Sequence, residues 1–260
     1  WHGTTPEAVK ALQRLVGGAL GTLTRGLLDP SPYVGLVEPV LGQNMLAMCA
    51  AGVGGGSLVY QGMTLQPAAE VFEQVMPGSL DFELMDRVYY PRVARMLQVE
   101  TAPDELIGTP TYKAPRVFKR RAEQAGFDVE KIPMPIDWDY ALAELRGEMT
   151  PAYTNGAGAM GVNNGGKHSV DVTYVDSAVA TGNVTVRTLH EVTAVKRSAD
   201  GSWVVHVDRT DESGRVVERI EMTTDALIMA AGTMNTTRLL VEAQARGTIS
   251  DLPDELGSDW

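Results

Sequence analysis

The residues best suited to hold a ligand form a short run rich in glycine, in which positions 52–59 read GVGGGSLV. Because glycine has no Cβ, consecutive glycines let backbone amide groups approach a ligand that any side chain would push away. A pyrophosphate or a flat ring system is a ligand of this kind, although a flexible turn explains the same composition. The run lacks the lysine of a P-loop and the G-x-G-x-x-G spacing, so neither nucleotide-binding motif is satisfied.

The histidines and carboxylates supply no clear catalytic centre. His2 is the second residue, and His206 lies beside Asp208 in an alternating segment where a solvated surface position is expected. His168 and His190 are interpreted as structural or surface residues. No spacing of histidines or carboxylates builds a metal site, and no serine lies in a nucleophile elbow. We therefore nominate no catalytic residue and no metal ligand, and metal-dependent or hydrolytic functions have no support.

The first part of the chain, residues 1–165, is predicted to combine loops with helices. Glycine and proline are frequent there, and they break helices because proline lacks an N–H donor and glycine permits left-handed turns. The predicted helices are 6–16, 67–97 with interruptions at 76–78 and at Pro91, and 112–125 closed by Gly126.

The second part, residues 166–260, shows a different pattern. Apolar and polar residues alternate over 203–208 and 216–221, which is typical of half-buried antiparallel strands. Residues 226–231 are apolar on both faces, as expected of a central strand covered on each side. The complete prediction is a helix at 169–180, strands at 184–186 and 192–195, a hairpin turn at 200–201, the two alternating strands, the central strand ended by Gly232, and a helix at 236–246 closed by Gly247. The fold class is mixed α/β.

Composition narrows the possible partners. The 260 residues contain 22 Lys and Arg against 33 Asp and Glu, a net charge of −11, so nucleic acid would be repelled. The one basic run, residues 119–121, is interpreted as a solvated helix face. Cys49 is the single cysteine, which excludes an internal disulfide. No apolar run reaches the ~20 residues of a membrane-spanning helix, so we expect a soluble protein, either cytoplasmic or secreted.

The sequences of several motifs resemble those of the glucose, methanol and choline (GMC) oxidoreductases, and among them those of the bacterial cholesterol oxidases. Residues 52–63 read GVGGGSLVYQGM, where those enzymes have text close to GVGGGSLVNGGM. The segments NNGGKHSVDVTY, TLHEV and AAGTMNTTRLL follow in the family's order, beginning at residues 163, 188 and 230. The resemblance covers nearly the whole chain.

The resemblance implies an FAD enzyme that oxidises an alcohol, which would be a small hydrophobic molecule such as a sterol. It implies a partial Rossmann-like FAD-binding domain with a central strand and an antiparallel meander over 166–260, and a flavin-contact loop with part of a substrate domain over 1–165. The cofactor-binding residues carried over from the family's motifs are Gly54, Gly55, Gly56, Ser57, Gly62, Met63, Val192 and Gly232.

Two departures from the family pattern qualify these expectations. Tyr60 and Gln61 stand where the family usually has Asn and Gly, so the flavin contact of that asparagine is lost and a bulky ring must be accommodated. The family's first βαβ unit and its catalytic His and Asn would lie outside this sequence, the latter two beyond Trp260. The chain is therefore expected to be an inactive internal fragment. The alternatives are a truncated relative that binds a ligand or partner without catalysis, and a nicotinamide-dependent dehydrogenase.

Overall fold

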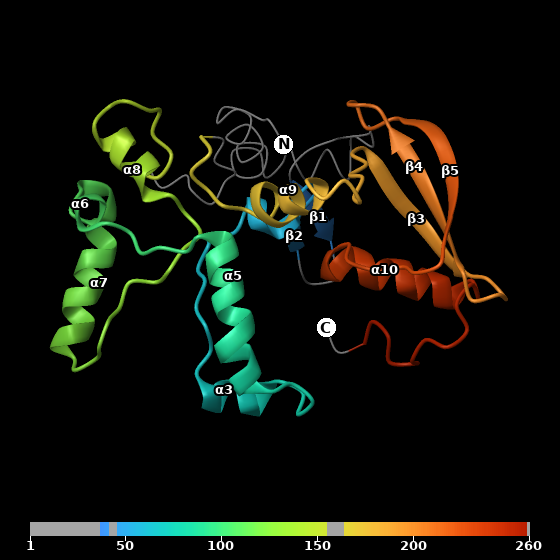
Figure 1. The fold of residues 1–260 in the computed structure, drawn as a ribbon, viewed down its shortest axis with the longest axis horizontal. Helices are drawn as coiled ribbons and strands as arrows, with labels where there is room; N and C mark the ends of the chain where they lie inside the picture. The colour runs from blue at the N-terminus through green and yellow to red at the C-terminus, as the bar shows by residue number, and fades with distance from the viewer. Residues whose placement is uncertain (1–36, 42–45, 155–163, 259–260) are drawn as a thin grey trace. The chain divides into compact units, whose positions relative to one another are not determined.

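The structure, a computed structural model, describes residues 37–41, 46–154 and 164–258. Two compact units are present (Figure 1). Residues 52–184 belong to the first unit, and the described residues before 52 and after 184 belong to the second. The assignment of 1–165 and 166–260 to two functional parts stays a prediction.

The first unit contains a long, bent helical segment (Figure 1). Helix α3 spans Ala69–Val75, and after a break at 76–81 helix α4 (Phe82–Leu84), the π-helical turn η2 (Met85–Tyr89) and helix α5 (Tyr90–Leu97) follow without a gap. The predicted break at 76–78 is confirmed, but the predicted interruption at Pro91 is wrong. Pro91 lies in the first turn of α5, where a missing N–H is tolerated, directly after the wider π turn.

Four further helical segments of the first unit follow. They are α6 (Asp104–Ile107), the 3-10 turn η3 (Pro110–Tyr112), α7 (Lys113–Gln124) and α8 (Trp138–Leu145). Helix α7 confirms the helix predicted at 112–125, and Gly126 after it has the positive φ of 87° that ends a helix. The sequence analysis did not predict α8.

A hydrophobic cluster holds α6 and α8 together. Its buried members are Ala102, Leu106, Ile136, Trp138, Ala141 and Tyr153. Glu144 of α8 is also buried, and its carboxylate accepts hydrogen bonds from the backbone N–H groups of Tyr153 (3.2 Å) and Thr154 (2.9 Å). Isolated β-bridges join Glu100 to Met134 and Ile136 to Lys167, so the segment that begins at residue 164 is attached to this cluster through its backbone.

The first unit ends with a predicted helix. The π-helical turn η5 (Asp171–Val175) continues into α9 (Asp176–Val179), which together confirm the helix expected at 169–180.

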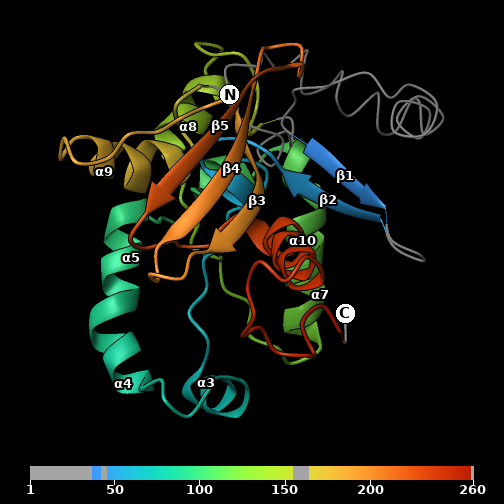
Figure 2. The ribbon, with the colours of Figure 1, turned by 90° about the vertical axis from the view of Figure 1, so that its right-hand side faces the viewer.

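The second unit contains two antiparallel sheets (Figure 2). Strands β1 (Val37–Leu41) and β2 (Leu46–Ala50) form one pair, in which Cys49 lies opposite Glu38. The other sheet has the order β3-β4-β5, with bounds His190–Arg197, Trp203–Thr210 and Val216–Thr224. The predicted meander is thus confirmed, including the turn at 200–201, where Gly201 has φ 90°.

One face of this sheet is buried against helix α10 (Gly232–Ala245), which packs on β3. Val195, Val205 and Val207 supply the strand side of that core, and Ala243 supplies the helix side. The alternation that the sequence predicts therefore has a physical cause, because one face of the sheet is covered by a helix and the other carries polar side chains.

Three predictions in this region are wrong. Residues 184–186 are not a strand, and Val184 and Val186 are each 42% exposed. Residues 226–231 are not a strand either, and Ile228 is 89% exposed. A strand requires a neighbour that supplies ladder hydrogen bonds, and no described residue pairs with either segment. Gly232 consequently opens α10 instead of ending a central strand, and the helix begins four residues before the predicted Thr236.

Leu189, the residue before β3, has an unusual backbone conformation. Its φ of 58° lies in the left-handed region, which is costly for a side chain with a Cβ. Its carbonyl accepts a hydrogen bond from the N–H of Thr210 at 2.8 Å, and this contact extends the pairing of β3 with β4.

Candidate functional site

The glycine run folds into a tight turn followed by the short 3-10 helix η1 (Gly55–Leu58). Gly54 and Gly55 have φ values of 105° and 54°, and a value as large as that of Gly54 is readily accessible only to glycine. The N–H of Gly55 donates to Gly52 O at 2.9 Å, and the N–H of Ser57 donates to Gly54 O at 3.2 Å. The run is therefore an ordered turn, and not a loose linker.

The surroundings of the three glycines differ. A Cβ built on Gly54 would lie 3.1 Å from Leu58 Cδ2 and 3.2 Å from Asp171 Oδ1, so this glycine is packed against the chain. A Cβ on Gly55 or Gly56 would meet no described atom within 4 Å. The described residues therefore leave space beside the backbone at Gly55 and Gly56, and the cofactor contacts of these glycines stay a prediction.

Ser57 fixes the turn to a distant segment. Its hydroxyl donates to Gly54 O at 2.7 Å and accepts a hydrogen bond from the N–H of Val170 at 2.9 Å. Two of the motifs that resemble the GMC family, at 52–63 and 163–174, therefore meet in the first unit.

Lys167 makes a second connection between these motifs. Its Nζ donates to Tyr60 O at 2.8 Å and to Leu58 O at 3.3 Å, and it lies 5.0 Å from the centroid of the Tyr60 ring. The side chain is buried, and burial lowers the pKa of Lys167 to about 8, while the Asp171 carboxylate acts in the opposite direction. The bulky Tyr60 ring is thus accommodated beside the ammonium group, and burial raises its phenol pKa.

Gly62 and Met63 follow the turn. Gly62 is buried with φ 83°, and a Cβ there would lie 3.0 Å from Pro135 Cδ. Met63 is 61% exposed. The N–H of Thr64 donates to Pro133 O at 3.0 Å, so this segment lies along residues 133–135.

The two remaining predicted residues, Val192 and Gly232, belong to the second unit. Val192 is half-buried in β3 opposite Val207, next to a bulge between Val192 and Ala194. Gly232 is exposed at the start of α10 with φ 78°, and a Cβ there would meet no described atom within 4 Å. The cofactor contacts of these residues stay a prediction.

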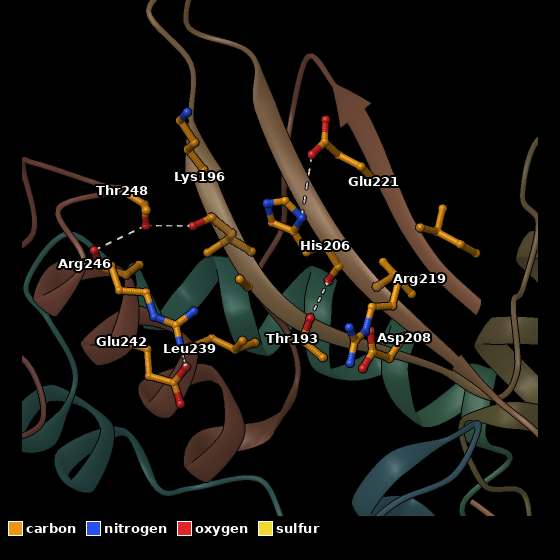
Figure 3. A pocket seen from close by; sticks show the side chains of 15 residues that line it. Thr193, Lys196, His206, Asp208, Arg219, Glu221, Leu239, Glu242, Arg246 and Thr248 are labelled. Carbon is orange, nitrogen blue, oxygen red and sulfur yellow. Dashed lines mark hydrogen bonds and ion pairs between the residues drawn. The ribbon is translucent and has the colours of Figure 1, made fainter. Parts of the chain in front are cut away.

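The second unit also has a groove of about 580 Å³ between α10 and the sheet (Figure 3). Its charged side chains are Lys196 and three pairs of opposite sign: Arg246 with Glu242 at 3.1 Å, Arg219 with Asp208 at 3.7 Å, and His206 with Glu221 at 3.7 Å if the imidazole is protonated. Since these charges largely neutralise one another, the groove offers no concentrated charge to a phosphate.

Sequence reasoning missed the contribution of Lys167 and Val170. Both lie in the segment NNGGKHSVDVTY, which was used only for its resemblance to the family. The available signal was a lysine directly after two glycines, but its partners are more than 100 positions away in the chain. Among the described residues no group of three or more His, Cys, Asp or Glu side chains could hold a metal ion.

Comparison with known proteins identifies the family. Residues 14–245 match the family model described as GMC oxidoreductase, and the chain belongs to this family of FAD-binding oxidoreductases, which act on CH–OH donors. The resemblance found in the motifs is thereby confirmed. None of the helices in the described ranges is both long and apolar enough to cross a bilayer.

Two curated relatives are cholesterol oxidases from Mycobacterium tuberculosis, strains CDC 1551 / Oshkosh and ATCC 25618 / H37Rv. Each is 30% identical to this chain over 234 residues, which are 83% of this chain and 39% of the relative. The chain thus spans about two fifths of the length of the curated relatives it matches.

Proposed function

We propose that this chain supplies a flavin-contacting part of an enzyme that oxidises a bulky hydrophobic alcohol, such as a sterol. In this proposal Gly54, Gly55, Gly56 and Ser57 contact the flavin and its pyrophosphate, and Gly62 and Met63 lie near the flavin edge. For Val192 and Gly232 the resemblance to the family supports a cofactor contact. The alcohol oxidation is proposed for an enzyme of the relatives' length, of which this chain matches 39%.

The observation that carries the proposal is the accessible backbone at Gly55 and Gly56 in a turn that is otherwise firmly held. Ser57 attaches the turn to Val170 at 2.9 Å, while a Cβ at Gly55 or Gly56 would meet no described atom within 4 Å. A rigid turn with open peptide groups can receive a flat ring and a pyrophosphate without an ordering cost, because its conformation is already fixed. The described residues therefore fit the cofactor of the family.

The chain's own contribution is to bind and orient. Bound FAD would accept the hydride that leaves the carbinol carbon, while the hydroxyl proton passes to a base. Orientation of the cofactor depends on the turn at 54–57 and on its attachment to residues 167–170. Exposed Met63 offers an apolar surface beside the turn, which suits a hydrophobic substrate better than a sugar. The identity of the relatives as cholesterol oxidases supports the same substrate class.

A Gly56→Val variant tests the cofactor contact directly. The new Cβ would meet no described atom within 4 Å, and φ at this position is not left-handed, so the protein should fold, but a cofactor lying against Gly56 would be displaced. Gly78→Val is the matched control, because a Cβ at Gly78 also meets no described atom within 4 Å and its φ is not left-handed. We expect the protein made from its complete gene to carry a yellow flavin chromophore, and only Gly56→Val to lose it.

The outcomes separate the candidate functions. A wild-type protein without chromophore, which does not bind added FAD, contradicts the proposal and favours a non-catalytic relative. Bleaching of the flavin by a sterol under anaerobic conditions supports a bulky alcohol substrate. Bleaching by small alcohols alone would refute the substrate class while the flavoenzyme assignment stands.

A further inference from the structure

Lys167 is a buried cation with a defined set of partners. The side chain of this residue is buried, with 5% of the residue exposed, although a charge inside a protein is costly unless it is hydrogen-bonded. Its Nζ donates to Tyr60 O and Leu58 O and faces the Tyr60 ring. Asp171 is the negative group whose charge acts on it, and burial lowers the pKa of the lysine to about 8.

The two carbonyl groups that Lys167 contacts lie at the exit of the glycine turn. Leu58 is the last residue of η1, and the final carbonyl groups of a helix have no partner within it. The lysine supplies a donor to the carbonyl group of Leu58 and to that of Tyr60, two residues beyond the helix. The ammonium group thus fixes the path of the chain from η1 to Gly62, just as Ser57 fixes the start of the turn.

The backbone around Lys167 is held independently of its side chain. The N–H of Asp137 donates to Gly166 O at 2.7 Å, the N–H of His168 donates to Pro135 O at 2.9 Å, and Ile136 forms a bridge with Lys167. The segment therefore keeps its attachment to the core when the lysine side chain is changed.

We propose that Lys167 is a positioning residue for the flavin-binding turn: by binding Leu58 O and Tyr60 O, its ammonium group holds residues 54–60 in the conformation that receives FAD. The inference rests on the proposed function, and it adds a residue that acts through the turn. No contact between Lys167 and the cofactor is required.

Lys167→Met tests this role, with Lys131→Met as the matched control. Lys131 also donates to a backbone carbonyl, Ala102 O at 2.8 Å, but this contact lies beside α6 and away from the glycine turn. We expect Lys167→Met to weaken FAD binding to the apoprotein about tenfold or more, which corresponds to about 1.4 kcal/mol, and Lys131→Met to leave it unchanged. Amide hydrogen exchange over residues 54–60 should become faster only in Lys167→Met.

A second variant covers the case in which Lys167→Met does not fold. Lys167→Gln keeps N–H donors without the charge, and its FAD affinity should fall between those of the wild type and the methionine variant. The visible spectrum of bound flavin should also change in both Lys167 variants, because a displaced turn alters the surroundings of the ring. A residue needed only for stability would lower the melting temperature without changing that spectrum.

The results distinguish this inference from the proposed function. If the wild-type protein binds FAD and Lys167→Met binds it within twofold of wild type, the inference is overturned and the proposed function stands. A loss of affinity with unchanged exchange over 54–60 overturns it as well, since the lysine would then not act through the turn. If the wild-type protein does not bind FAD, both are overturned.

Discussion

The hydroxyl of Ser57 provides the most direct test of the link between the glycine turn and the segment at 167–171. Ser57→Ala removes one oxygen atom and with it two hydrogen bonds, the donation to Gly54 O at 2.7 Å and the acceptance from Val170 N–H at 2.9 Å. The alanine fits the 3-10 helix at this position, so the change does not require the backbone to move.

The expected magnitude follows from what the substitution leaves behind. The Val170 N–H loses the partner described above, and a partly buried donor without a partner costs about 1–3 kcal/mol. Gly54 O still accepts from the N–H of Ser57, so its loss is smaller. We therefore expect a destabilisation of about 2 kcal/mol, which corresponds to a melting temperature lower by about 4–8 °C for a unit of this size.

Urea unfolding of the variant measures this change, and amide exchange locates it. In Ser57→Ala the amide hydrogen of Val170 should exchange faster than in the wild type, because the free energy that protects it is lower. Ser177→Ala is the control, because Ser177 is exposed in the same unit and its hydroxyl makes only a long contact of 4.0 Å with the sulfur of Met96 among the described residues. A Ser57→Ala protein as stable as Ser177→Ala, with unchanged exchange at Val170, would refute the link.

Three further predictions concern the same unit. Gly62→Ala should destabilise the protein by about 2 kcal/mol in urea unfolding, because φ is 83° and the new Cβ would lie 3.0 Å from Pro135 Cδ. Glu144→Gln should cost about 2 kcal/mol or more in the same assay, since its NH₂ group would face backbone N–H donors of Tyr153 or Thr154. Lys167 should make stability rise with pH between about 8 and 10, because the folded protein releases this proton at about pH 8 and the unfolded chain retains it to its ordinary 10.5. The difference in unfolding free energy between wild type and Lys167→Met, followed across that window, should grow by at most about 3 kcal/mol.

For each of these three predictions, one experimental result would contradict the reasoning. Comparison of Gly62→Ala with Gly126→Ala isolates the destabilisation that is due to the clash with Pro135. Gly126 also has a positive φ, but a Cβ there would meet no described atom within 4 Å. Equal losses of unfolding free energy in the two variants would mean that Pro135 moves away from the new Cβ without destabilising the protein. Glu144→Gln at wild-type stability would mean that the carboxylate is not needed as an acceptor. A difference between wild type and Lys167→Met that does not change with pH would show that the lysine titrates normally.

Local patterns predicted much of the fold. The meander β3-β4-β5 could be predicted because apolar and polar residues alternate along its strands. This alternation arises because α10 covers one face of the sheet and the other face carries polar side chains. Helix ends at Gly126 and Gly247 were predicted because glycine tolerates left-handed φ, which both residues have. The effect of Pro91 was predicted wrongly because proline interrupts a helix only in its interior. Pro91 lies in the first turn of α5, directly after the π turn, where the missing N–H is tolerated. Residues 226–231 were misread because apolar composition marks burial but does not provide a pairing partner.

The candidate site was predicted only in part for a similar reason. The glycine turn could be predicted because the residues that leave its backbone without side chains are consecutive in the sequence. Lys167 and Val170 contact it across more than 100 residues, and one sequence contains no measure of that proximity. The lysine also contradicts the usual expectation that cations are exposed, since its cost of burial is offset by carbonyl groups at the end of η1.

Leu189 offers a route to a more robust protein. A leucine held at φ 58° stores about 1–2 kcal/mol of backbone strain, and asparagine adopts this conformation more readily. The strain is maintained by the pairing of β3 with β4, which begins at this residue through the bond from Thr210 N–H to Leu189 O. A Leu189→Asn substitution, at a residue that is 37% exposed, would release part of that energy without emptying a core. The position is therefore a natural starting point for thermostability engineering.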